Sequence, residues 1–224
     1  TSRTLKSLDE IVKRIRDLGR DVLPLELDVR SLDSIVAAVQ AAKAHYGKLD
    51  ILVCNAGCNV RKPAVDVTWD DWNLILDTNL RGSFFLAQQA AKELMIPAKY
   101  GRIILIGSVT CVAGYAGLAP YGASRGGVKQ MAMALADDWG VHGITVNVLA
   151  PGWFKTAQNA VMYQDEEWVD YLSDRIPLKR PGAMPDLDGP LLFLASEESR
   201  YVTAQTLLVD GGISGGATRA LPRK

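Results

Sequence analysis

Residues 101–127 read GRIILIGSVTCVAGYAGLAPYGASRGG, and this stretch decides the fold. The apolar run Ile103–Ile106 has a glycine close to each end, a composition typical of a short buried strand. Pro120 follows after a loop, and proline is favoured in the first turn of a helix. A buried strand that leads into a helix is the repeating unit of α/β proteins.

The helix that Pro120 opens carries Tyr121 and Arg125, whose four-residue spacing puts both side chains on one helix face. A positive charge near a phenol favours the phenolate form, so we expect Arg125 to assist proton exchange by Tyr121. Ser108 lies at the carboxyl end of the strand, thirteen residues before Tyr121. Open α/β sheets bind their ligands at that end. Ser108 and Tyr121 are therefore predicted to hold one carbonyl oxygen between them.

Outward from this stretch, strand and helix periodicities alternate, which predicts a doubly wound parallel sheet with helices on both faces. Strands are predicted at 22–29, 49–54, 101–107, 144–149 and 206–209. Helices are predicted at 7–18, 31–46, 69–92 and 120–140. The chain has no internal repeat or low-complexity tract, so residues 1–224 are predicted to form a single Rossmann-like domain.

Composition limits the kinds of partner. Of the 224 residues, 48% are hydrophobic, and 25 basic residues balance 25 acidic ones. A zero net charge gives no electrostatic footprint for nucleic acid or an anionic membrane, and no apolar stretch approaches the ~20 residues of a membrane span. A small-molecule ligand and a cytoplasmic location are expected. Cys54, Cys58 and Cys111 lack zinc-site spacing, so we predict reduced structural thiols and no metal.

The order of the motifs resembles that of the short-chain dehydrogenase/reductase family. Its signature comprises a serine, a Tyr-x-x-x-Lys pair, an Asn-Ala-Gly turn and a further asparagine, and the matching residues are Ser108, Tyr121, Asn55-Ala56-Gly57 and Asn79. Further matches are Asp28-Val29, Pro151-Gly152 with Thr156, and residues 207–212. The resemblance covers nearly the whole chain. The loops are most similar to those of sugar-acid dehydrogenases, such as those acting on gluconate, and of ketoacyl-carrier reductases.

This resemblance implies a nicotinamide dinucleotide site. Asn79 would hold a water in a proton relay, Asp28 would accept the adenine amino group, and Val29 would pack on the adenine ring. The other residues implied to contact the cofactor are Asn55, Ala56, Gly57, Tyr121, Arg125, Pro151, Gly152 and Thr156. Plainer interpretations remain: Asp28 as a helix cap, residues 55–57 as an ordinary turn, and Asn79 as a polar kink in an apolar helix.

Arg3 bears on the choice of cofactor. A cation just after the family's second strand can pair with a 2′-phosphate, whereas an acidic residue there would hold the free ribose hydroxyls. NADP is therefore favoured over NAD, and the alternative is a surface arginine at the start of a helix. Trp153, Met162, Tyr163 and Trp168 are interpreted either as an apolar substrate lid or as ordinary core.

Two departures from the family pattern stand out. The family's lysine is Arg125 here, which keeps the charge but is larger and cannot release its proton. The opening residues also lack the glycine-rich turn that binds the cofactor pyrophosphate. The family order then places Thr1 near the end of the second strand, so we expect an amino-terminally incomplete domain. In that case a gap of unpaired backbone would separate the strand at 22–29 from the strand at 49–54.

The leading prediction is an oxidoreductase that interconverts a secondary alcohol and a ketone, with NADP(H) as hydride carrier. The substrate class is a small sugar acid, polyol or ketoacyl compound. The alternative is a noncatalytic or truncated relative that binds or builds oligomers. Family members commonly pair through the helices equivalent to 69–92 and 121–140, so a homodimer or homotetramer is expected. Met131, Met133 and Leu135 are candidate contacts and are equally suitable as core residues.

Overall fold

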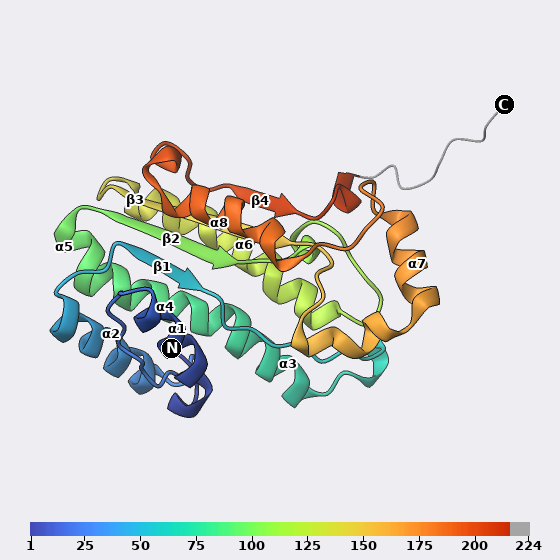
Figure 1. The fold of residues 1–224 in the computed structure, drawn as a ribbon, viewed down its shortest axis with the longest axis horizontal. Helices are drawn as coiled ribbons and strands as arrows, with labels where there is room; N and C mark the ends of the chain where they lie inside the picture. Colours follow the sequence, from blue (N-terminus) through green and yellow to red (C-terminus); the bar gives the residue numbers. More distant parts are fainter. Residues whose placement is uncertain (216–224) are drawn as a thin grey trace.

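A computed structural model describes residues 1–215, and residues 216–224 of the predicted domain lie outside that range. The described residues form a sheet of four parallel strands in the order β1, β2, β3, β4 (Figure 1). The strands are β1 (Ile51–Cys54), β2 (Gly101–Ile106), β3 (Ile144–Pro151) and β4 (Thr206–Val209). The predicted α/β class with a Rossmann-like parallel sheet is confirmed.

Helices cover both faces of this sheet. The side chains of α2, α4 and α6 share one core with one face of the strands, and α8 packs on the other face (Figure 1). The helices are α1 (Asp9–Asp17), α2 (Leu32–Tyr46), α3 (Trp69–Leu76), α4 (Gly82–Ala90), α5 (Ile96–Ala98), α6 (Ala119–Gly140), α7 (Glu166–Arg175) and α8 (Asp188–Ala195). None of the described helices is both long and apolar enough to cross a membrane.

The alternation of apolar side chains along β2 and β3 explains why helices must cover both faces of the sheet. Ile103 and Leu105 lie in the core shared with α4 and α6, whereas Ile104 lies in the core under α8. Successive side chains of a strand point to opposite faces, so a strand that is apolar throughout is buried on both sides. This arrangement fixes the carboxyl ends of β1, β2 and β3 at one edge of the sheet.

The helix predicted at 69–92 is present but not regular. The helical run continues from Trp69 to Ala98 and contains two π-helical segments, Asp77–Arg81 and Ala91–Met95. Single π-turns inside helices occur frequently at functional sites. The first π-segment contains Asn79, which is fully buried. The polar kink considered for Asn79 is therefore a π-turn.

The prediction of a strand at 22–29 is wrong. Within the described chain, this segment has no place in the sheet, and its only ladder contact is an isolated parallel bridge between Ser2 and Glu26. A strand needs a backbone partner along its length, and the available one is brief, with Leu27 N donating to Ser2 O at 2.8 Å. The apolar pattern marked burial correctly, because Leu27 and Val29 lie in the core. It carried no information about pairing.

Candidate active site

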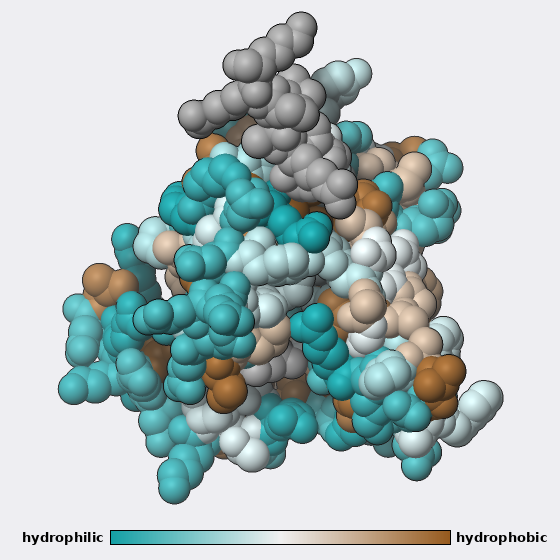
Figure 2. Space-filling view, turned by 90° about the vertical axis from the view of Figure 1, so that its right-hand side faces the viewer, coloured by the Kyte–Doolittle hydropathy of each residue, from teal (hydrophilic) through white to brown (hydrophobic). Residues whose placement is uncertain are grey.

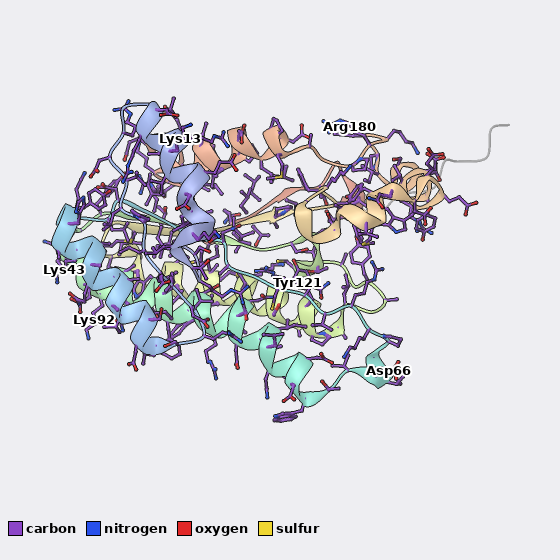
Figure 3. All side chains as sticks on the ribbon, turned by 60° about the horizontal axis from the view of Figure 1, so that its bottom comes forward. Lys13, Lys43, Asp66, Lys92, Tyr121 and Arg180 are labelled. Carbon is purple, nitrogen blue, oxygen red and sulfur yellow. The ribbon has the colours of Figure 1, made fainter. Side chains whose placement is uncertain are left out.

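The site lies where the described strands end. All four strands are parallel, and the arrowheads of β1, β2 and β4 point to the same side of the molecule (Figure 1). Figure 2 looks onto this edge, where hydrophilic side chains predominate around scattered hydrophobic ones. Tyr121 lies on α6, between the strands and α3 (Figure 3). Ligands of open α/β sheets bind at such an edge.

Ser108 begins the short 3₁₀ helix Val109–Cys111 from extended backbone. Its Oγ accepts a hydrogen bond from Thr110 N at 3.2 Å, and the side chain is 8% exposed. A hydroxyl that accepts one bond still has a proton to donate. Ser108 is thus held in place by its acceptor side and can donate to a carbonyl oxygen.

Tyr121 and Arg125 occupy one face of α6, as their spacing predicts. The Arg125 guanidinium carbon lies 5.1 Å from the centre of the half-buried Tyr121 ring. Arg125 itself is 4% exposed, and its Nη1 donates to Ile106 O at 2.7 Å. The cation is therefore fixed at the end of β2, under the phenol, in a cation–π arrangement.

Gly57 makes room for this guanidinium. A methyl group at position 57 would collide with Nη2 of Arg125, so the loop after β1 approaches the arginine as closely as a glycine allows. On the other side, Cys111 Sγ lies 3.1 Å from Arg125 O, where its thiol can donate. Burial raises the pKa of the Cys111 thiol, which keeps it a neutral donor. Arg125 is enclosed by β2, the β1 loop and its own helix.

Asn79 connects the loop after β1 to α6 through hydrogen bonds. Its Oδ1 accepts from Cys58 N at 2.8 Å, and its Nδ2 donates to Cys58 O and to Ser124 Oγ, both at 3.0 Å. Ser124 Oγ donates in turn to Tyr121 O at 2.7 Å. Ser124 and Cys58 were missed in the sequence, although Ser124 lies three residues after Tyr121 and so faces the same side of the helix. The Asn79 amide thus pairs with the partly buried N–H and C=O of Cys58 and also reaches the helix that carries Tyr121.

Comparisons with known proteins agree with this geometry. A family profile described as enoyl-(acyl carrier protein) reductase matches residues 2–214. Gluconate 5-dehydrogenase of Gluconobacter oxydans is 37% identical over 95% of this chain and 82% of its own length. The chain belongs to the short-chain dehydrogenase/reductase family. Members of this family are NAD(P)-dependent oxidoreductases.

Other members of the family match as well. 2-Dehydro-3-deoxy-D-gluconate 5-dehydrogenase of Escherichia coli is 38% identical over 91% of this chain and 80% of its own length. A solved structure of a gluconate 5-dehydrogenase from Burkholderia cenocepacia, in complex with NADP and tartrate, is 36% identical. It superposes with a TM-score of 0.92 and covers 96% of this chain and 84% of that one.

In this family member, the residues predicted to bind adenosine lie together near the amino terminus. The Asp28 carboxylate is held by Arg30, through Nε at 3.2 Å and Nη2 at 3.0 Å. The pKa of Asp28 is lowered chiefly by this hydrogen bond, and the charge of Arg3 acts in the same direction. Asp28 does not cap α2, because Ser31 Oγ does so. Val29 is buried against Gly82.

The residues predicted to contact ribose and nicotinamide follow β1 and β3. Asn55, Ala56 and Gly57 are exposed. After Pro151, the N–H of Gly152 donates to Val209 O at 2.9 Å, which joins this loop to β4. Thr156 Oγ1 donates to Asn159 Oδ1 at 3.0 Å, and its lone pairs remain able to accept a bond from an amide.

No group of three or more histidine, cysteine, aspartate or glutamate side chains within residues 1–215 is arranged to hold a metal ion. The three cysteines are free thiols. Burial raises the pKa of Cys54 to about 12, so this thiol is unreactive at neutral pH. The chemistry of the described site rests on hydroxyl, phenol, amide and guanidinium groups.

Proposed function

We propose that this chain interconverts the secondary alcohol of a small sugar acid and the corresponding ketone, with NADP(H) as hydride carrier. The observation that carries the proposal is the grouping of Ser108, Tyr121 and Arg125 at the carboxyl edge of the sheet, braced by Asn79. A hydroxyl donor, a proton donor and a fixed cation around one oxygen match the requirements of carbonyl reduction.

In the direction of reduction, Ser108 Oγ donates a hydrogen bond to the ketone oxygen. Tyr121 transfers its phenolic proton to that oxygen, so the C=O bond becomes C–O–H and the phenol becomes phenolate. The buried Arg125 guanidinium stabilises the negative charge left on the ring. Asn79 positions the helix of Tyr121 through Ser124. The nicotinamide, when bound, supplies the hydride to the carbonyl carbon.

The described residues fit such a cofactor in two respects. The exposed small residues 55–57 leave the backbone at the end of β1 open to a ribose. Arg3 is exposed and acts electrostatically on Asp28, so a cation and a carboxylate stand where the adenosine is proposed to bind. Arg3 supports NADP over NAD, and the Burkholderia cenocepacia relative was solved with NADP.

The preference for a sugar acid rests on relatives that are described as acting on gluconate and 2-dehydro-3-deoxy-D-gluconate. The family profile instead points toward acyl-carrier substrates. These differ in chemistry, because a sugar acid is small and anionic whereas an acyl thioester is long and apolar near the reacting carbon. A substrate panel with members of both classes separates the two.

A second candidate function, a noncatalytic binding protein, is favoured by the state of Arg125. Its guanidinium donates to Ile106 O and is enclosed by Gly57, so it is less able than a lysine ammonium to reach a ribose hydroxyl or pass on a proton. We expect slow turnover with retained ligand binding. Arg125→Lys should raise kcat by about 10²-fold, the lower end of the range that general acid–base groups contribute. An unchanged kcat would remove the support for this second candidate.

The test of the proposed function is NADPH oxidation with a panel of keto-aldonates, ketoses and ketoacyl thioesters, repeated with NADH. Tyr121→Phe keeps the ring and removes the proton donor, so it should lower kcat by about 10² to 10⁴, whereas NADPH binding, followed by nicotinamide fluorescence, should change far less than kcat. Tight NADPH binding with no reduction of any ketone would favour the noncatalytic function.

A further inference from the structure

Cys111 closes the short helical turn that Ser108 begins. The turn is the 3₁₀ helix Val109–Cys111, and Ser108 is the residue that precedes it. The main chain of Cys111 is bound back to Ser108, because Cys111 N donates to Ser108 O at 2.8 Å. Ser108 Oγ accepts from Thr110 N within the same turn. Cys111 and the Ser108 hydroxyl therefore belong to one small hydrogen-bonded unit.

The side chain of Cys111 leaves this unit and reaches α6. Its Sγ lies 3.1 Å from the main-chain oxygen of Arg125, a distance at which the thiol donates a hydrogen bond. A helix carbonyl that accepts from the N–H four residues later keeps a second lone pair for such a donor. The thiol is thus a direct link between the turn of Ser108 and the helix of Tyr121.

Packing holds the thiol against α6. Gly107 lies behind it, and a Cβ added at Gly107 would come within 2.9 Å of Cys111 Sγ and within 2.5 Å of Val148 Cγ1. Neither contact leaves room for another methyl group. The thiol therefore fills a space bounded by the end of β2, by β3 and by α6. A change in the size of the side chain at position 111 alters the separation of the turn and the helix.

Arg125 is bound on both sides of Ser108 along the chain. Its Nη1 donates to Ile106 O at 2.7 Å, two residues before Ser108. Its main-chain oxygen accepts from Cys111, three residues after Ser108. The arginine stem has several rotatable bonds, so the guanidinium bond alone holds the helix backbone loosely. The bond from the Cys111 thiol acts on the helix backbone itself and removes that freedom.

The position of the Tyr121 phenol follows from that of Arg125. Tyr121 lies about one turn earlier on the same face of α6, and its ring centre is 5.1 Å from the Arg125 guanidinium carbon. A movement of α6 at Arg125 therefore moves the phenol relative to Ser108. Both hydroxyls must lie within hydrogen-bond reach of one carbonyl oxygen, at about 2.6–3.2 Å. A misplacement of ~1 Å can cost about 10²-fold in rate.

We propose that Cys111 is a positioning residue that sets the distance between the Ser108 hydroxyl and the Tyr121 phenol by binding the main chain of Arg125. This inference rests on the proposed function, because it assigns the residue that aligns the two groups on the substrate oxygen. The plain alternative is a core side chain, since Cys111 also packs against the hydrophobic core. A core side chain contributes to stability and has no specific effect on turnover.

The experiment measures kcat, KM and urea unfolding for substitutions of Cys111, with the ketone that the parent protein reduces fastest. Cys111→Ala removes the donor and should lower kcat by about tenfold. The KM for the ketone and the binding of NADPH, followed by nicotinamide fluorescence, should change far less than kcat, because alignment matters most in the transition state. Cys111→Ser keeps a donor of similar size and should restore most of the parent's kcat.

Cys54→Ala is the matched control. Cys54 is 3% exposed, and its Sγ lies 3.9 Å from Ser83 O in α4, so this change also removes a buried thiol next to a helix carbonyl. It should lower stability at least as much as Cys111→Ala does, but it should keep the parent's kcat. The inference is overturned if Cys111→Ala keeps the parent's kcat, if Cys111→Ser loses as much as Cys111→Ala, or if Cys54→Ala lowers kcat equally.

Failure of the proposed function is distinguished by a structural arm. If the parent reduces no ketone, crystal structures of the parent, Cys111→Ala and Cys111→Ser measure the distance between Ser108 Oγ and Tyr121 Oη directly. Functional groups must be held to within about 0.5 Å of their productive geometry. A change larger than that in Cys111→Ala, with the parent's distance kept in Cys111→Ser, supports the positioning role although the oxidoreductase proposal has failed. A smaller change, or an equal change in Cys111→Ser, overturns the positioning role as well.

Discussion

At the scale of single residues, the contact between Gly57 and Arg125 determines how the cation is held. The glycine leaves no room for a side chain beside Nη2, and overpacking a filled site costs ~1–3 kcal/mol. Gly57→Ala should therefore lower the free energy of unfolding by about that amount. In an Arg125→Lys background, the same substitution should cost about half as much or less, because the smaller ammonium can move aside.

A double-mutant cycle measured by urea unfolding tests this coupling between positions 57 and 125. Gly122 is the matched control, because a Cβ there has no atom within 4 Å. Gly122→Ala in the same helix as Arg125 should show no coupling to position 125. Equal costs of Gly57→Ala in the two backgrounds would show that the arginine is not the residue that the glycine accommodates.

At the scale of elements, the π-segment Asp77–Arg81 orients Asn79 toward the loop after β1. Asn79→Ala removes three hydrogen bonds and leaves the partly buried N–H and C=O of Cys58 without their partners. The expected loss is about 1–3 kcal/mol of unfolding free energy, together with a lower kcat. Urea unfolding and turnover are both measured, and Gln130→Ala on the exposed face of α6 is the control. A change in turnover without any loss of stability would contradict a bracing role.

The stability of the amino end of α3 should depend on pH in the acidic range. The pKa of Asp71 is held at about 2, first by its hydrogen bond with Lys62 and then by Thr68, below an unfolded value near ~3.9. A carboxyl whose pKa is lower in the folded state stabilises the fold above the unfolded value, and this contribution is lost as the pH falls toward the folded value. Stability should therefore decline from about pH 4 to about pH 2.

Thermal unfolding of Asp71→Asn across that range measures the contribution of Asp71. The variant should be less stable than the parent at neutral pH and should lose less stability on acidification. Asp66→Asn is the control, since Asp66 is an exposed carboxylate of the same region (Figure 3) with no ion pair among the described residues. If the parent and Asp71→Asn have parallel acid profiles, the ion pair with Lys62 does not stabilise α3.

At the scale of the whole molecule, apolar side chains remain exposed beside the amino ends of α3 and α6. Val65 is 92% exposed and Trp69 79%, and a groove of about 330 Å³ lies between Trp69 and Pro120. We expect these surfaces to be covered in a homodimer or homotetramer. Of the contacts predicted from the sequence, Met133 is exposed, whereas Leu135 is buried in the core of the chain itself.

Light scattering during gel filtration tests this expectation. The parent should elute with the mass of a dimer or tetramer, and Trp69→Glu should shift the mass toward the monomer by introducing a charge at the covered surface. Tyr201→Glu is the control, because Tyr201 is fully exposed in the turn after α8 and away from the groove. A monomeric parent at micromolar concentration would be the contrary result.

The sequence predicted what depends on local pattern. The strand ending before Ser108 and the helix beginning near Pro120 follow from apolar runs and turn residues. The helix cap considered at Asp28 was wrong, because Ser31 caps α2. The sequence-based prediction failed where backbone pairing determines the secondary structure. Residues 22–29 have the composition of a strand, but within the described chain their only bridge partner is Ser2. The sequence-based prediction also gave no sign that Asn79 would bond Cys58, because those residues are 21 positions apart and meet only through the fold.

The packing of Gly57 on Arg125 also has an evolutionary consequence. A guanidinium enclosed in this way couples two positions that are 68 residues apart in the sequence. Among descendants of this chain, replacement of the glycine should become tolerable only after the arginine has been replaced by a smaller cation. The order of these two substitutions is thereby constrained, and the first change at position 125 decides which changes at position 57 remain accessible.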